Sequence, residues 1–209
     1  MEINVLRLGQ IGTNCYIFRQ EGGHQCGVVD PGDQGEQVAR WLKDKGLEPQ
    51  AILLTHGHFD HILGIPGLRS EWPDLPVYCH SADFGEGDTT EMFGESFPTV
   101  RSFGDITPYR EGDVVEVAGI KIEVLETPGH TPGSVTLRAG NVLFTGDTLF
   151  AGSMGRTDFP GGDEGQIMAS LRRLGELPGD YQVLPGHEGR STLERERQSN
   201  YCLRAAMRG

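Results

Sequence analysis

The sequence predicts an α/β fold in which short strands and a smaller number of helices form layers. Short apolar runs bounded by Gly, Pro and Asp recur along the chain, which is the pattern of strands separated by tight turns. Glycine makes up 31 of the 209 residues, roughly double the usual 7%, so we expect many sharp turns. Hydrophobic residues make up 36% of the chain, enough for a packed core, and no apolar run approaches the roughly 18 residues that a membrane span needs.

The spacing of apolar residues predicts the individual elements. Strands are expected near residues 3–8, 13–19, 26–29, 51–55, 76–79, 113–118, 120–126, 133–138, 141–145 and 181–184. Helices are expected over residues 34–46, after Asp163, and over residues 192–207. The stretch 83–110 has no periodicity and is expected to be a long surface excursion of the kind that often carries function. Nothing divides the chain, so residues 1–209 are expected to form a single domain.

Charge and cysteine content exclude several classes of protein. The net charge of −12 repels phosphate backbones, so neither nucleic acid nor a membrane is an expected partner. The N-terminus has an acid at Glu2 and no basic region ahead of an apolar block, which is unlike a secretory signal. The four cysteines form no Cys-x-x-Cys pair and are expected to be free thiols of a cytoplasmic protein. Three of them lie in apolar runs, where burial is expected: Cys15, Cys26 and Cys79; the fourth is Cys202.

Three of the seven histidines lie in the string THGHFDH, directly after a buried strand. In an extended chain His56, His58 and Asp60 would point to one side and His61 to the other, so all four converge only if the chain turns at Asp60–His61, where Gly57 would help it bend. Imidazoles and carboxylates are the ligands of a borderline divalent cation. A lone His-x-His is more often a solvated loop, and Asp60 alone could cap a helix, but the full string predicts a metal site.

Three further ligand candidates each follow an apolar strand and a turn. His130 follows IEVLETPG, Asp147 follows NVLFTG and His187 follows YQVLPG. Alone, each could be a buried core histidine or a turn residue. Because sites in open sheets form at the carboxyl ends of strands, their coincidence predicts one converging site. His24, in a polar turn, and His80 are expected to be structural.

The motifs THGHFDH, TPGHTPGS, TGDTLF and PGH together resemble the metallo-β-lactamase superfamily, in order from about Cys15 to the C-terminus. Within that superfamily, GTNCYIF, VVDPGD, GSMGRTDFPGGD and TLERER are similar to the glyoxalase II group, and more closely to its short bacterial hydrolases. The resemblance implies an αββα sandwich, in which two mixed sheets lie face to face with helices outside.

The resemblance also implies two divalent metal ions, zinc first and iron or manganese as options. Carried over position by position, it gives one ion to His56, His58 and His130, the other to Asp60, His61 and His187, and makes Asp147 the bridge between them. Asp60 and Asp147 are the expected catalytic residues. Their carboxylates and a bridging hydroxide would neutralise all but about one of the positive charges of the two divalent ions, and that remaining charge would hold a polarised carbonyl. Asp30 in VVDPGD is expected either to orient a ligand imidazole or to form a turn before proline.

The implied reaction is hydrolysis of a small-molecule thioester of glutathione or another thiol, by the bridging hydroxide. Arg156 in GSMGRTDF is expected to hold an anionic substrate tail, or else to pair with Asp158, which stands where glyoxalase II enzymes have a tyrosine. Those enzymes also have a helical region that contacts glutathione, which is absent after His187. The metal chemistry is therefore better supported than the choice of thiol, and the protein is expected to be a monomer or a small homo-oligomer.

Other functions stay open. Persulfide dioxygenases of the same superfamily also contain GRTDF, and in them a single iron would be held by what are here His56, His130 and Asp147, a set suited to oxygen chemistry. The PGGD and TLERER motifs favour the hydrolases. A metal-binding protein without turnover is a third possibility, disfavoured because all seven ligand residues are present. A β-lactamase is not expected, because those enzymes work in the periplasm.

Overall fold

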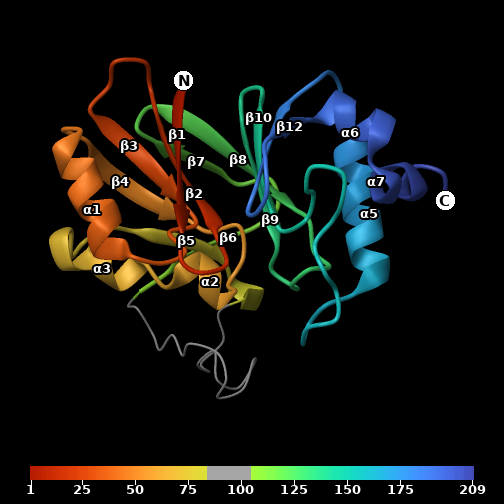
Figure 1. Ribbon diagram of the computed structural model, residues 1–209, viewed down its shortest axis with the longest axis horizontal. Coiled ribbons are helices and arrows are strands. Elements are labelled where there is room, and N and C mark those ends of the chain that lie inside the picture. The colour runs from red at the N-terminus through yellow and green to blue at the C-terminus, as the bar shows by residue number, and fades with distance from the viewer. Residues whose placement is uncertain (84–104) are drawn as a thin grey trace.

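The computed structural model describes residues 1–83 and 105–209, which form two six-stranded sheets lying face to face (Figure 1). In spatial order the first sheet contains β1 (Glu2–Leu8), β2 (Thr13–Arg19), β3 (Gln25–Val29), β4 (Glu48–Leu53), β5 (Val77–His80) and β6 (Thr107–Tyr109). The second contains β12 (Ser191–Thr192), β11 (Gln182–Pro185), β10 (Val142–Gly146), β9 (Val135–Ala139), β8 (Ile120–Glu126) and β7 (Val114–Val117). Both sheets are mixed, because β3 to β6 run parallel to one another, as do β10 and β11, whereas the other neighbours are antiparallel.

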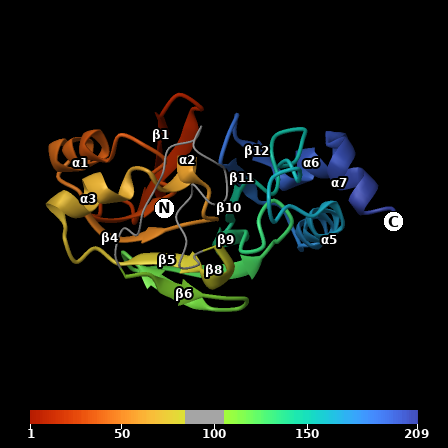
Figure 2. The ribbon, with the colours of Figure 1, turned by 90° about the horizontal axis from the view of Figure 1, so that it is seen from below.

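Helices cover the outer faces of the two sheets (Figure 1). The first sheet is covered by α1 (Gly35–Asp44) and α3 (Ile65–Glu71), and the second by α5 (Glu164–Gly175), α6 (Leu193–Ser199) and α7 (Tyr201–Ala206). The one-turn helix α2 (Phe59–Ile62) lies near the edge where the sheets meet (Figure 2), and the 3₁₀ turn η1 (Ser81–Asp83) follows β5. The αββα sandwich implied by the resemblance is confirmed.

Buried apolar side chains form three layers: one between the first sheet and its helices, one between the two sheets, and one between the second sheet and its helices. In β2, Cys15 and Ile17 belong to the layer beneath α1 and α3, whereas Tyr16 and Phe18 belong to the central layer. Both aromatic rings contact Phe144 of β10, at centroid distances of 5.5 and 5.8 Å. Because successive side chains of a strand point to opposite faces, a sheet buried on both faces needs the uninterrupted apolar runs seen in the sequence.

The stretch 83–110 and the C-terminal helix differ from the sequence prediction. The stretch 83–110 contains β6, a three-residue strand beside β5 that is too short to produce a visible period, and residues 84–104 lie outside the described part of the chain. The predicted helix over residues 192–207 is wrong in one respect, because the extended residue Asn200 divides it into α6 and α7. The Asn200 side chain accepts a hydrogen bond from the backbone N–H of Leu203 and so caps α7.

The helices α2 and α3 were not predicted, since α2 is a single turn and α3 is short and contains Pro66 and Gly67. Free thiols are confirmed for the four cysteines, with Cys202 half-buried and the others buried; burial raises the pKa of Cys26 to about 12. No helix in the described ranges has the length and apolar character needed to cross a bilayer.

Helices α1 and α3 cross at Gly35 and Gly67, so no side chain separates the two backbones. A β-carbon on Gly67 of α3 would lie 2.6 Å from the backbone nitrogen of Glu36 and 2.7 Å from the α-carbon of Gly35. Backbone atoms cannot move aside as a side-chain tip can, so only glycine permits this approach. Part of the glycine excess therefore serves close packing and not turns.

We expect Gly67→Ala to lower the free energy of unfolding by about 1–3 kcal/mol, because the methyl group pushes the two helices apart. The helix propensity gained by alanine, about 1 kcal/mol, offsets only part of this. The measurement is urea denaturation. The matched control is Gly189→Ala, where a β-carbon meets no atom within 4 Å, and equal stability of the two variants would contradict the close crossing.

Candidate metal centre

The predicted ligands all follow the carboxyl ends of strands, and these ends converge where the two sheets meet. The string THGHFDH follows β4, and the other three candidates follow β8, β10 and β11. The structure brings all seven predicted ligand residues together: His56, His58, Asp60, His61, His130, Asp147 and His187. Neither His24 nor His80 joins them; His80 lies 3.1 Å from Glu126 instead, in keeping with its expected structural role.

The turn required by THGHFDH is made by a helix. His58 is extended (φ −65°, ψ 146°) and is the N-cap of α2, which begins at Phe59. Asp60 and His61 therefore lie in the first turn of α2, while His56 and His58 precede it. The chain turns at His58, two residues earlier than predicted, and it does so because a helical turn brings residues on both sides of the N-cap to one centre.

The donor atoms form three overlapping groups, each with its atoms within 4.8 Å of one another: His56, His58 and His130; His56, His61 and Asp147; and Asp60, His61 and His187. His58 Nδ1 and His130 Nε2 are 2.8 Å apart, and His187 Nε2 lies 3.2 Å from an Asp60 oxygen. Two ligands that each bind an ion at about 2.1 Å can be at most about 4.2 Å apart. Each of these two pairs lies within that limit and can share a cation.

Two buried atoms at the centre have no hydrogen-bond partner among the described residues: Nε2 of His56 and Oδ1 of Asp147. Leaving a buried polar atom unsatisfied costs about 1–3 kcal/mol. A cation would satisfy both atoms, since each presents a lone pair to the centre. The donor set of imidazoles and carboxylates suits zinc, iron or manganese.

Hydrogen bonds on the outer side of three imidazoles fix which nitrogen faces the centre. His130 Nδ1 donates to the carbonyl oxygen of Arg156 at 2.7 Å, and His61 Nδ1 donates to Asp30 at 3.0 Å. The Thr55 hydroxyl donates to Asp30 at 2.6 Å and therefore accepts from His56 Nδ1 at 3.1 Å. In all three rings Nδ1 is the outer donor, so Nε2 is the nitrogen that faces the centre.

Asp30 orients an imidazole, which was one of its two predicted roles. Its carboxylate also accepts a hydrogen bond from the backbone N–H of Thr55 at 2.8 Å. The backbone of Asp30 is left-handed (φ 51°). This conformation is unfavourable for residues other than glycine and persists only where the surroundings hold it. Asp30 is buried, and its oxygens reach His61 directly and His56 through Thr55.

Burial and the neighbouring charges distinguish two pairs among the five imidazoles. Burial, reinforced by the other imidazoles, lowers the pKa of His56 well below its usual value and that of His58 to about 3. Both rings are therefore neutral at physiological pH, the form that binds a metal.

The second pair lies beside the carboxylates. Burial favours the neutral form of His61, but the charges of Asp60, Asp147 and Asp30 outweigh it and raise the His61 pKa to about 9. Hydrogen bonds with Asp147 and Asp60 likewise overcome burial and raise the pKa of His187 to about 10. In return, the imidazoles keep the pKa of Asp60 and that of Asp147 low despite burial. This half of the centre attracts positive charge.

Glycines allow the backbone to approach the ligands. A β-carbon on Gly32 would collide with the carbonyl oxygen of Asp60, and one on Gly155 would collide with that of Asp147. A β-carbon on Gly186 would lie 2.7 Å from the His61 ring and collide with the Asp147 carboxylate. The sequence predicts that the glycine excess forms turns, whereas these glycines contact ligand segments that no local pattern reveals.

The loop after β10 forms one side of the centre. The guanidinium of Arg156 makes two hydrogen bonds to the carboxylate of Asp158, at 2.6 and 2.7 Å, and lies 3.8 Å from the centre of the Phe159 ring. The Phe159 ring is 6.0 Å from that of His58, and Phe150 is 6.1 Å from His187, both edge-on. Sequence analysis missed these two aromatic residues, although Phe159 ends the very motif that carries Arg156.

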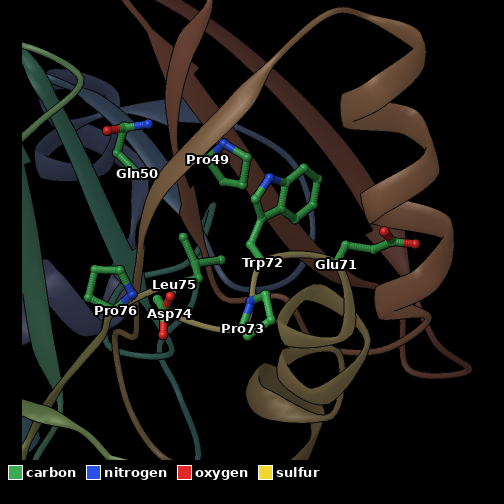
Figure 3. A pocket seen from close by; sticks show the side chains of 8 residues that line it. All are labelled: Pro49, Gln50, Glu71, Trp72, Pro73, Asp74, Leu75 and Pro76. Carbon is green, nitrogen blue, oxygen red and sulfur yellow. The ribbon is translucent and has the colours of Figure 1, made fainter.

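A hollow lies at the amino ends of β4 and β5 (Figure 3). It is lined by residues 49–50, at the start of β4, and 71–76, ahead of β5. The ligand candidates follow the carboxyl ends of strands, whereas this hollow borders amino ends. It contains no histidine and has no part in the candidate centre.

Fold and centre together define a protein with a histidine- and aspartate-rich metal centre at one edge of an αββα sandwich. Residues 8–187 match the family described as the metallo-beta-lactamase superfamily, and the chain belongs to that superfamily. It is 34% identical over 205 residues to the probable metallo-hydrolase YqgX of Bacillus subtilis, covering 94% of each chain. It is 30% identical over 216 residues to the hydroxyacylglutathione hydrolase GloC of Haemophilus influenzae, covering 97% of this chain and 98% of the relative.

Solved structures with the same fold cover nearly the whole chain. BLEG-1 B3 metallo-beta-lactamase superposes with a TM-score of 0.86 at 33% identity, covering 97% of this chain and 99% of that one. TTHA1623 in a di-iron-bound form gives 0.83 at 37% identity, with coverage of 95% and 98%. ETHE1 from Myxococcus xanthus gives 0.80 at 28% identity, with coverage of 99% and 88%.

We expect Asp147→Ala to lose bound metal, because this carboxylate lies 3.4–3.5 Å from ring nitrogens of His61, His130 and His187 and would contact both cations. Elemental analysis of protein purified without added metal measures the loss, and circular dichroism checks that the strands still form. Asp158→Ala is the control, since Asp158 is an exposed aspartate paired with Arg156. Retention of two ions per chain by Asp147→Ala would rule out its bridging role.

Proposed function

We propose that this chain is a metal-dependent thioester hydrolase of the hydroxyacylglutathione hydrolase type, with two divalent cations in the candidate centre. The observation that carries the proposal is the convergence of seven donor side chains around the unsatisfied atoms His56 Nε2 and Asp147 Oδ1. The ligand sets proposed are His56, His58 and His130 for one ion and Asp60, His61 and His187 for the other, with Asp147 between them. Zinc is the proposed metal, and the iron in TTHA1623 supports iron as an alternative.

Cations held there would activate water at neutral pH and polarise the thioester carbonyl. The chain contributes the orientation of the ligands. The backbone carbonyl of Arg156 holds the His130 ring, and Asp30 holds that of His61, each directing Nε2 toward the centre. The Thr13 hydroxyl donates to Asp60 at 3.1 Å, which leaves that carboxylate fewer orientations. Rings fixed in this way need little reorganisation during the reaction.

The rim of the centre supports a small-molecule substrate. Phe159 and Phe150 place apolar rings beside His58 and His187, where an acyl chain could pack and bulk water would be displaced. The Arg156 guanidinium offers a positive charge at the same rim. The name of the Haemophilus influenzae relative supports a glutathione thioester as the substrate. We further propose a single cytoplasmic domain that acts as a monomer or a small homo-oligomer, without a nucleic-acid or membrane partner.

A second candidate is a mononuclear iron persulfide dioxygenase that uses only His56, His130 and Asp147. The GRTDF motif supports it. The hydrolase is preferred because Asp60, His61 and His187 form a second compact donor group that a single-iron enzyme would not need.

Substitutions in that second donor group separate the two candidates. We expect Asp60→Ala and His187→Ala each to slow hydrolysis of S-lactoylglutathione by about 10² or more, the scale of losing one major electrostatic element. Both leave His56, His130 and Asp147 intact. The rate is followed by release of the thiol, and nitrocefin is assayed in parallel because BLEG-1 is a β-lactamase.

An oxygen electrode supplies the opposing measurement. Wild-type protein is expected to consume no oxygen with glutathione persulfide. Rapid persulfide-dependent uptake that survives both substitutions would replace the hydrolase by the dioxygenase. Rapid nitrocefin cleavage without thioester cleavage would also end the thioesterase proposal.

Arg156→Ala tests recognition of the substrate tail. If the guanidinium binds an anionic group, KM for S-lactoylglutathione rises by roughly tenfold or more while kcat changes little, the pattern of lost uniform binding. Asp158→Ala frees the guanidinium from its partner and is expected to leave KM equal or lower. A fall in melting temperature with unchanged KM would mean that the pair only shapes the loop.

A further inference from the structure

A carboxylate outside the proposed ligand set contacts both loops that supply His56, His58 and His130. Asp83 Oδ2 accepts hydrogen bonds from the backbone N–H of Gly57 at 2.9 Å and from the Thr131 hydroxyl at 2.7 Å. Its Oδ1 accepts from the backbone N–H of Gly133 at 2.6 Å.

We propose that Asp83 is a positioning residue that sets the relative placement of the two ligand loops, and through it the metal affinity of the His56, His58 and His130 group. This inference rests on the proposed assignment of those three residues to one cation.

The three donors lie beside the ligands in sequence. Gly57 separates His56 from His58, and Thr131 directly follows His130. A shift of either loop relative to Asp83 therefore moves a ligand by a similar amount. The nitrogens that must stay close, His58 Nδ1 and His130 Nε2, are 2.8 Å apart but come from different loops.

Another described backbone contact between these segments lies on the strand side of the ligands, where the N–H of Val135 donates to the carbonyl of Thr55 at 2.8 Å. This bond joins the segment after β4 to the start of β9. It does not fix the loop of His56 and His58 relative to the loop of His130. The Asp83 carboxylate joins the loops on the far side of His56. The two attachments, one on each side, define the separation of the loops.

Both glycines make room for this carboxylate. A β-carbon on Gly57 would lie 2.8 Å from the carbonyl oxygen of Asp83 and 3.0 Å from its β-carbon. A β-carbon on Gly133 would lie 2.5 Å from Asp83 Oδ1. Any larger residue at either position would push the loop away from the turn Ser81–Asp83. In THGHFDH the glycine thus serves the approach of Asp83, whereas α2 makes the turn.

The hydroxyl of Thr131 completes the arrangement. It donates its proton to Asp83 and therefore accepts one from the Ser134 hydroxyl, at 2.7 Å. The Ser134 oxygen in turn accepts from the backbone N–H of Thr131 at 3.1 Å. Asp83 is thus tied to the interior of the His130 loop and not only to its surface. Its effect on a metal would be exerted through the ligand loops, because it is not itself among the converging donors.

The test measures zinc affinity at each site separately by competition with a chromophoric chelator. In a His187→Ala background the remaining proposed site is His56, His58 and His130. Adding Asp83→Asn to this background is expected to weaken zinc binding about 10–100-fold, the usual effect of losing a residue that holds a metal ligand in place. Asparagine has the same shape, but its NH₂ group cannot accept a hydrogen bond. In a His58→Ala background the remaining site is Asp60, His61 and His187, and Asp83→Asn is expected to change its affinity less than about threefold.

The control is Asp180→Asn. Asp180 Oδ1 also accepts from two backbone N–H groups, those of Tyr181 and Glu194, at 2.9 and 2.8 Å, but it lies on another part of the chain. It is expected to leave both affinities unchanged. Thr131→Val, which removes one donor, gives a smaller loss at the first site, and Thr131→Ser restores it, so the inference stays testable if Asp83→Asn folds poorly.

The outcomes are distinct from those that test the proposed function. Equal weakening of both sites, with a lower melting temperature of the metal-free protein, would reduce Asp83 to a general structural role and overturn the inference. Unchanged affinity at the first site would overturn it as well, and so would a first site that binds no zinc in the His187→Ala background. Selective weakening in a protein that does not hydrolyse thioesters would support Asp83 and reject the thioesterase.

Discussion

The geometry of the candidate metal centre depends on the hydrogen bonds of the buried Asp30 carboxylate. This carboxylate receives hydrogen bonds from both the backbone and the hydroxyl of Thr55 and from the His61 ring. Through the Thr55 hydroxyl it also determines the orientation of His56, so one carboxylate fixes an imidazole in each proposed ligand set. A carboxylate buried this deeply is tolerated only when its oxygens are hydrogen-bonded, and the same bonds hold Asp30 in its left-handed conformation.

Close backbone packing allows these contacts to exist at all. The ligands arrive on separate loops from both sheets, and the loops have to approach one another more closely than side chains would permit. Glycine at positions 32, 155 and 186 provides that space around the ligands, as Gly35 and Gly67 do between α1 and α3. The sandwich and the metal centre therefore share a requirement for glycine at contacts between segments remote in sequence.

The electrostatics of the centre explain why one scaffold suits related reactions. Neutral, deeply buried His56 and His58 lie on one side, and the carboxylate-rich group around Asp60 lies on the other. In the proposed assignment, the first group with His130 would hold one cation, the second group would hold another, and Asp147 would lie between them. The two candidate functions therefore differ in whether the second group would be needed. At the rim, the guanidinium of Arg156 stacks on the Phe159 ring, while the backbone carbonyl of Arg156 holds the His130 ring.

The sequence by itself determined the chemistry of the ligands and most of the strands. Residue types and the apolar runs that precede them are local properties, and they suffice to predict a metal centre at strand ends. The tertiary structure alone decided that His58 and His130, 72 residues apart, approach within 2.8 Å, and that Asp83 receives donors 26, 48 and 50 residues away. It also decided the short helices α2 and α3. The physical reason is that periodicity records which face of a segment is buried, whereas the segment that covers it is chosen by packing of the whole chain.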